Sequence, residues 1–268
     1  MAALNDSDAP SGKTRITVSD GALIPDRGES SVFSAWNIAF FGALSLIILL
    51  PALSPDPYLE VLRFLPDGIL RTFQVTVTSI IFALIIGLIT GLGRISQVTI
   101  INRLATVYVE VIRGIPLLVQ LFYIYFALGR FLSLERMVAA ILAMSICYGA
   151  YMGEIFRAGI QSIPKGQMEA ALALGMSRRQ ALRLVILPQT MRTILPPIGN
   201  EFIALLKDSS LVSIVAVSDL LRRGREYAST TFFYFESYTM VALIYLVITL
   251  FFSKLVGIME ERLETGGR

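Results

Sequence analysis

Ionisable and amide side chains lie inside three long apolar stretches of this sequence, at residues 105–128, 137–160 and 193–217. Their spacing is helical, so that residues three, four or seven positions apart share a face. The set comprises Glu110, Arg113, Gln120, Glu154, Arg157, Asn200, Glu201, Lys207 and Asp208. A charge near the centre of a bilayer costs at least about 2.5–3.5 kcal/mol, so such groups pair with one another or face a wet cavity.

Two interpretations of these charges remain open. In the structural one they pair between helices, for instance Arg113 with Glu110 or Glu154, and Lys207 with Asp208. In the functional one some of them line the path of a zwitterionic solute. A free amino acid carries a carboxylate and an ammonium, so its site needs a basic and an acidic group close together.

Several kinds of chemistry are excluded by residue types that the sequence lacks. It has no histidine and a single cysteine, Cys147. Ser-His-Asp triads, Cys-His dyads, Cys/His zinc sites and internal disulfides are therefore impossible within the chain. The net charge of +3 is too small to indicate a nucleic-acid partner.

The elements that must position these residues are membrane helices. Of the 268 residues, 55% are apolar and 16% are charged, and the apolar ones gather in stretches of about 20 residues, enough to span a bilayer. The sequence predicts an all-α integral membrane protein with about six spans, at 34–53, 70–92, 105–128, 137–160, 193–217 and 236–257. Residues 1–32 form a polar tail, 33–66 the first span and an outer loop, 67–258 the core, and 259–268 a second tail.

The basic residues of the loops set the orientation. With the N-terminus in the cytoplasm, the inner segments hold roughly twice as many basic residues as the outer loops. The inner ones are Lys13, Arg15, Arg27, Arg94, Arg103, Lys165, Arg178, Arg179, Arg183, Arg192, Lys254, Arg262 and Arg268. The outer ones are Arg63, Arg130, Arg136, Arg222, Arg223 and Arg225. Both termini are therefore expected in the cytoplasm.

Depth within each span orders the solute-path candidates. Arg113 and Glu154 fall closest to mid-membrane among the paired charges and are the first choices, and Asn200 follows because an amide can serve either end of the ligand. Arg157 and Glu201 are placed nearer the cytoplasmic face, where a side chain reaches water. The full set of candidates is Arg113, Glu154, Asn200, Glu110, Gln120, Lys207, Asp208 and Ser209.

Two glycine and proline patterns predict local geometry. Gly114 and Pro116 fall in the middle of the third span, where proline permits a kink and frees carbonyl groups. Gly87 and Gly91 form a GxxxG pair in the second span, which favours close packing of two helices.

The loop at 162–190 is predicted to hold two short helices at an angle. Its first half is rich in helix formers and ends at Gly175, a natural left-handed stop. Ser177 and Gln180 make a capping box for the second helix, which Pro188 should end or bend.

These residues resemble the EAA loop of ABC-importer permeases. The matching positions are Glu169-Ala170-Ala171, Gly175 and Leu187-Pro188, with Val185 in place of the usual isoleucine. Residues 110–120, 153–160 and 199–211 are similar to motifs of the polar-amino-acid branch of that family. The resemblance covers about residues 67–258.

The resemblance implies a type I ABC importer fold and a transport cycle of alternating access. It implies a second permease chain, identical or related, two cytoplasmic ATPase subunits and an extracytoplasmic amino-acid-binding protein at a bacterial inner membrane. No cofactor is expected in this chain, because ATP and Mg²⁺ would bind to the ATPase subunits. The expected ATPase-docking residues are Glu169, Ala170, Ala171, Gly175, Met176, Ser177 and Arg178.

One rival interpretation is an ion-coupled secondary amino acid transporter. It would use Glu110 and Glu154 as coupling carboxylates. It gives no reason for the helix–glycine–helix loop, and the sequence shows no internal repeat of the kind common in such transporters. A membrane enzyme is disfavoured further, because Asp208 is the only aspartate well inside a span.

Overall fold

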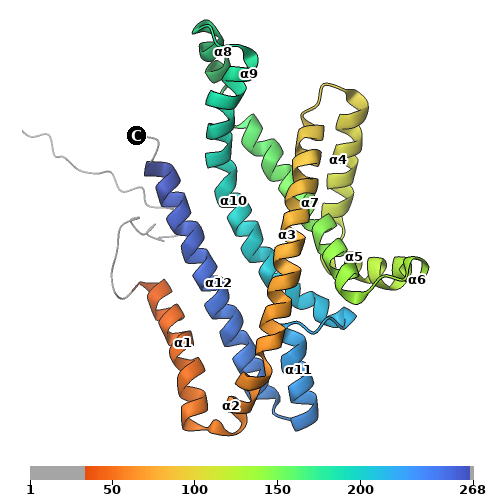
Figure 1. Cartoon of the computed structure of the whole chain (residues 1–268), viewed down its shortest axis with the longest axis vertical. Helices are drawn as coiled ribbons and strands as arrows, with labels where there is room; N and C mark the ends of the chain where they lie inside the picture. The colour runs from red at the N-terminus through yellow and green to blue at the C-terminus, as the bar shows by residue number, and fades with distance from the viewer. Residues whose placement is uncertain (1–33, 266–268) are drawn as a thin grey trace, which may run out of the picture.

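The computed structural model describes residues 34–265, and this part of the chain is helical throughout its regular elements (Figure 1). The helices are α1 (Ala35–Leu53), α2 (Pro55–Phe64), α3 (Pro66–Arg94), α4 (Thr99–Gly114), α5 (Leu117–Phe122), α6 (Gly129–Leu132), α7 (Arg136–Gln161), α8 (Lys165–Ala173), α9 (Arg178–Ala181), α10 (Leu187–Asp208), α11 (Leu220–Thr231) and α12 (Tyr234–Thr265). Two π-helical turns, η1 (Tyr123–Leu128) and η2 (Leu182–Ile186), and a 3₁₀ turn, η3 (Ser209–Val215), connect them. The tail predicted at 1–32 lies outside the described residues.

Four helical segments are long and apolar enough to cross a membrane. They are Ala35–Leu53, Pro55–Arg94, Arg136–Gln161 and Tyr234–Leu263. A fifth candidate is the pair Thr99–Gly114 and Leu117–Leu132, which is bent by 101°. The predicted stretch 193–217 is not a single straight span, because α10 ends at Asp208 and a 3₁₀ turn follows. Helix α12 continues to Thr265, past the predicted core boundary at 258.

The sharp bend between α4 and α5 occurs at the predicted kink. Pro116 has no N–H to continue the α4 hydrogen-bond pattern, and the backbone of Ile115 is extended there (φ −106°, ψ 128°). The buried Gln120 side chain donates from Nε2 to the carbonyls of Ile112 and Ile115, 2.8 Å away in each case. These two bonds satisfy carbonyl groups that the bend leaves free in an apolar setting. Beyond the bend, α5 packs against α7, and α6 lies to one side of the molecule (Figure 1).

Helices α3 and α7 pack closely through small residues, as the GxxxG pair predicts. A Cβ atom placed on Gly87 would lie 2.3 Å from Cβ of Met152, and one on Gly91 would lie 2.7 Å from Cβ of Phe156. The glycines therefore allow an approach that no larger residue would permit. This pair forms the centre of the molecule, with α10 and α4 beside it.

The loop after α7 forms the predicted helix–glycine–helix unit. Gly175 has the left-handed φ of +83°, and Ser177 and Gln180 form a complete capping box. Pro188 does not end the helix, because the chain stays helical through it into α10, and the alternative of a bend at Pro188 stays a prediction. The π-helical turn η2 lies just before Pro188. Its wider hydrogen-bond spacing tolerates a position at which proline has no N–H to donate. Helices α8 and α9 form one end of the molecule, and α2 and α11 lie at the other (Figure 1).

Candidate functional site

A polar pocket of about 440 Å³ opens at the bend between α4 and α5. We call it the bend pocket. It is bounded by the bend on one side and by α7 and α10 on the others. Its lining consists of Arg113, Gly114, Ile115, Pro116, Leu117, Cys147, Tyr148, Tyr151, Glu201, Ala204 and Asp208.

Arg113 supplies the only basic group among the lining residues. It lies one residue before the end of α4, and its guanidinium carbon is 5.1 Å from the centre of the Tyr151 ring. It has no ion-pair partner among the described residues. A guanidinium held over an aromatic face but not neutralised can bind an incoming carboxylate.

Two carboxylates of α10 face the same pocket. Asp208 accepts a hydrogen bond from the hydroxyl of Tyr148, at 2.8 Å. Glu201 is half-buried and forms no hydrogen bond or ion pair within residues 34–265. Glu201 therefore shares the bend pocket with the Arg113 guanidinium without a direct contact to it.

The structure gives Glu201 a different position along its helix. The prediction placed Glu201 near the cytoplasmic face from a span beginning at residue 193, whereas α10 begins at Leu187 and ends at Asp208. Glu201 is therefore six residues, or roughly 9 Å, further from the start of its helix than that span implied, and its depth in the membrane stays a prediction. It thereby reaches the pocket that also contains Arg113 and Asp208.

Glu154 and Glu110 form their ion pairs with other residues than the predicted ones. Glu154 contacts Arg157 on its own helix and Arg94 at the end of α3, not Arg113. Glu110 lies 3.6 Å from Arg94 and is 69% exposed. Arg94 was not among the candidates, because its contact with Glu154 joins residues 60 positions apart.

The remaining candidates lie away from the bend pocket lining. Asn200 and Lys207 are exposed on α10. Gln120 is 6% exposed and supports the bend, and the buried Ser209 hydroxyl donates to the carbonyl of Leu206 at 2.7 Å. Of the eight predicted solute-path residues, the structure brings Arg113 and Asp208 together in one pocket. The roles of all eight in the solute path stay predictions.

Sequence reasoning missed the α7 wall of the bend pocket. Cys147, Tyr148 and Tyr151 follow the three-to-four residue period of one helix face. Their position seven, six and three residues before Glu154, within a helix already carrying charges, is the signal that could have found them. Cys147 is a free thiol, 3% exposed.

The predicted ATPase-docking residues lie on the α8–α9 end of the molecule. Most of them are exposed, whereas Met176 is half-buried and Ala171 is buried. The space around a Cβ atom at Gly175 is empty. The backbone of the loop is thus exposed at Gly175, with no side chain covering it.

Comparison with known proteins decides the family. Residues 83–265 match the sequence profile of the binding-protein-dependent transport system inner membrane component family. The chain belongs to this family. The matched region begins within α3, so that α1 and α2 lie outside it.

Individual members of the family agree with this assignment. The glutamine transport system permease protein GlnP of Escherichia coli (strain K12) is 40% identical over 201 residues, covering 74% of this chain and 92% of that protein. The L-cystine transport system permease protein TcyB of Bacillus subtilis (strain 168) is 41% identical over 202 residues, covering 75% and 86%. A crystal structure of an amino acid ABC transporter with histidines matches with a TM-score of 0.72 and 42% identity, over 76% of this chain and 98% of that one. The fold is therefore that of an ABC importer permease, a multi-pass membrane transport component.

Proposed function

We propose that this permease carries an amino acid with a cationic side chain from the outer side to the cytoplasm, through the bend pocket. The single observation that supports this most strongly is the set of charges in that pocket: one guanidinium faces two carboxylates. The relatives named for glutamine and L-cystine act on molecules that share the carboxylate and ammonium of every amino acid. The side-chain class of the solute is inferred from the pocket itself.

The charges of the bend pocket balance against a basic amino acid. The α-carboxylate of the solute would bind Arg113, and its α-ammonium would bind one of Glu201 and Asp208. The second carboxylate would then need another cation, because an unpaired charge in a low-dielectric site is costly. A lysine- or arginine-like side chain supplies it.

The spacing of the two carboxylates fits a long side chain. Glu201 and Asp208 are seven residues apart on α10, which is two helical turns or about 10 Å along the axis. A solute with cationic groups at both ends of a four- or five-atom chain can bind both carboxylates at once. A short neutral side chain would leave one of them without a partner.

We propose the following assembly around the chain, for which the family and the exposed α8–Gly175–α9 loop are the support. A second permease chain, identical or related, completes the path, and two ATPase subunits that bind ATP and Mg²⁺ dock on that loop. An extracytoplasmic amino-acid-binding protein delivers the solute. Both termini are cytoplasmic, and ATP hydrolysis drives alternating access.

Membership of the family supports an ABC permease over a secondary transporter. The geometry agrees, because the two carboxylates suggested for ion coupling, Glu110 and Glu154, both lie within ion-pair distance of Arg94. A coupling carboxylate must release its cation during each cycle, which a fixed arginine opposes.

The chain's single cysteine gives a direct test. Cys147 lines the bend pocket, so a bound amino acid should slow its alkylation by N-ethylmaleimide in the assembled complex, followed by mass spectrometry of the Cys147 peptide. We expect L-lysine or L-arginine to protect Cys147 in the wild type and not in Arg113→Gln. An alkylation rate that no amino acid changes would contradict the proposed site.

A further inference from the structure

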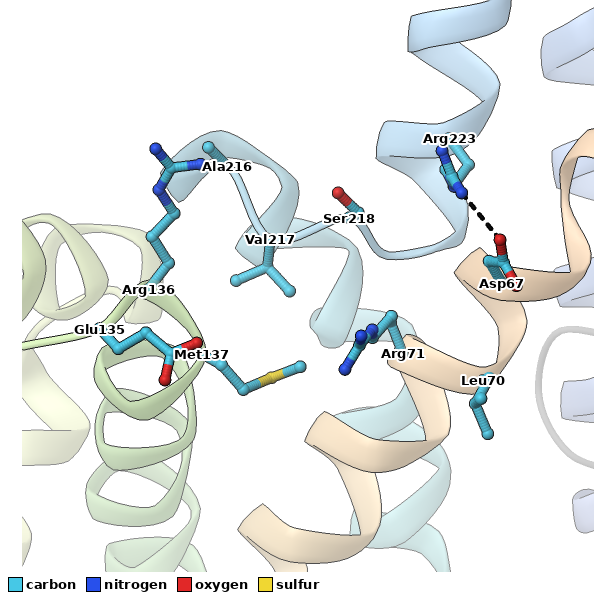
Figure 2. A pocket seen from close by; sticks show the side chains of 10 residues that line it. All are labelled: Asp67, Leu70, Arg71, Glu135, Arg136, Met137, Ala216, Val217, Ser218 and Arg223. Carbon is cyan, nitrogen blue, oxygen red and sulfur yellow. Dashed lines mark hydrogen bonds and ion pairs between the residues drawn. The ribbon is translucent and has the colours of Figure 1, made fainter.

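A second polar hollow, shown close up in Figure 2, lies beside α11, toward the end of the molecule away from α8 and α9 (Figure 1). We call it the outer pocket, because that end faces outward when the α8–α9 loop is cytoplasmic. Its volume is about 530 Å³. The start of α3, the start of α7, the segment before α11 and α11 itself line it with Asp67, Leu70, Arg71, Glu135, Arg136, Met137, Ala216, Val217, Ser218 and Arg223.

Arg223 is fixed within the wall of the outer pocket. Its guanidinium forms an ion pair with Asp67 at 2.9 Å and lies 3.6 Å from Glu226. The guanidinium carbon is 4.8 Å from the centre of the Phe64 ring, and the buried Nε has no hydrogen-bond partner among residues 34–265. Figure 2 shows the contact with Asp67 at the rim.

Arg71 and Arg136 are different, because neither has a carboxylate partner among the described residues. Arg71 donates only to the amide oxygen of Gln74, at 2.9 Å, and projects into the hollow from α3 (Figure 2). Arg136 is the first residue of α7, where the helix dipole disfavours a cation. With three guanidiniums against two carboxylates, the outer pocket carries one excess positive charge.

The inner end of the outer pocket is closed. Val217 is 4% exposed and belongs to the apolar core that separates this pocket from the bend pocket, and Met137 packs against that core. Ala216, on the same wall, has a left-handed φ of 64°, which a residue with a side chain rarely adopts. The wall of the outer pocket at Val217 therefore belongs to the packed core of the protein.

We propose that the outer pocket is a socket for acidic side chains of the extracytoplasmic binding protein that delivers the solute. The inference rests on the proposed function for the existence of that partner. Charge complementarity is the argument: two guanidiniums without partners face a hollow large enough for more than one carboxylate side chain. A free cationic amino acid is the wrong occupant, because the excess charge of the pocket repels it.

Filling the socket would also change the field that the solute meets. Unneutralised guanidiniums at the outer end repel a cationic solute, and bound carboxylates cancel that repulsion. Docking and admission of the solute would thus be coupled through charge. This coupling predicts that binding of an acidic partner weakens as salt is added.

A labelled peptide tests the socket on the assembled full-chain complex in nanodiscs. The probe is fluorescein-labelled hexaglutamate, with hexaserine as the neutral comparison, measured by fluorescence anisotropy. We expect hexaglutamate to bind, and its affinity to fall at least tenfold in the double variant Arg71→Gln/Arg136→Gln and between 50 and 300 mM NaCl. Arg130→Gln is the matched control, because Arg130 is an exposed basic residue of the same outer loop that does not line the pocket.

Three results would overturn the proposal. The first is equal binding of hexaglutamate to the double variant and the wild type. The second is equal binding of hexaglutamate and hexaserine. The third is displacement of hexaglutamate by the same concentration of free acetate, because that result indicates a small-anion site. Protection of Cys147 by L-lysine, measured on the same double variant, separates this outcome from failure of the proposed function. Retained protection shows that the variant is folded and that the bend pocket functions whatever the peptide does.

Discussion

In the proposed site, Arg113 and Glu201 are the two residues on which solute recognition would depend most directly. Each is charged, faces the bend pocket and has no ion-pair partner among the described residues, so each is available to a ligand. Hydrogen bonds to charged groups contribute about 1.5–3 kcal/mol. Losing one of them should therefore weaken binding roughly ten- to a hundredfold.

We predict that Arg113→Gln lowers the affinity for every amino acid, whereas Glu201→Gln lowers it selectively for L-lysine and L-arginine. Arg113 would bind the carboxylate that all amino acids share. With the α-ammonium on Asp208, Glu201 would bind a cation that only some of them carry. Binding of radiolabelled L-lysine and L-glutamine to the purified complex measures both. Glu236→Gln, outside the pocket, is the control. Equal losses for L-lysine and L-glutamine in Glu201→Gln would show that the pocket does not select a cationic side chain.

Glu154 illustrates a charge whose role depends on packing. It contacts Arg94 and Arg157, and the Arg94 side chain is only 13% exposed. We predict that Glu154→Gln destabilises the complex by about 1–3 kcal/mol, because it removes the main carboxylate partner of a buried guanidinium. Glu110→Gln should cost less, since Glu110 is 69% exposed. Thermal unfolding of the two variants makes the comparison, and the reverse order would contradict the ion-pair account.

At the scale of elements, α11 begins at a buried acid. Asp219 is 0% exposed, caps α11 by accepting from the backbone N–H groups of Leu221 and Arg222 at 3.1 Å, and lies outside the spans. Burial raises the pKa of Asp219 to about 6, against the lowering effect of those hydrogen bonds. A carboxyl with a raised pKa holds its proton more strongly in the folded state. The stability that protonated Asp219 contributes is fully present below the pKa that Asp219 has in the unfolded state. It is lost as the pH rises through about 6, the pKa of Asp219 in the folded state.

We therefore predict that the wild type loses stability relative to Asp219→Asn as the pH rises from about 4 to about 6. Asparagine keeps the cap and cannot ionise, so the difference between the two thermal unfolding temperatures isolates this one group. A difference that does not change across this range would show that Asp219 does not titrate there.

The loop of α8 and α9 is the element expected to transmit ATPase motion. Gly175 has φ +83° and open space where a side chain would project. We predict that Gly175→Val reduces uptake at least tenfold per ATP hydrolysed while the complex stays in the membrane. The valine would strain the turn and obstruct the docking surface. Gly257→Val, another open glycine but on α12, is the control. Normal coupling in Gly175→Val would rule out docking at this joint.

Local signals in the sequence predicted these elements well. Gly175, the Ser177–Gln180 capping box and the bend at Pro116 each depend on residues a few positions apart, and all three are present. The contact of Arg94 with Glu154 and the position of Glu201 along α10 could not be predicted from such local signals. The first joins distant residues, and the second depends on where α10 begins, which Pro188 concealed because the chain stays helical through it.

At the scale of the whole molecule, the permease separates three tasks along its length. In the proposed account the α8–α9 loop at one end is the docking surface, the bend pocket is the solute site, and the outer pocket holds arginines beside α11 (Figure 1, Figure 2). Close packing of α3 against α7 connects these regions, because both helices extend from the outer pocket toward the loop end. Helix α1, outside the matched family region, packs on α12 and α2 at the edge of this unit.

The central claim is that ATP hydrolysis drives a cationic amino acid through the bend pocket. Uptake of radiolabelled L-lysine into proteoliposomes that hold the complete complex, with or without trapped ATP, tests it most directly. The account predicts accumulation only with trapped ATP, and loss of that accumulation in Glu201→Gln. Accumulation without ATP, driven by a sodium or proton gradient, would contradict it.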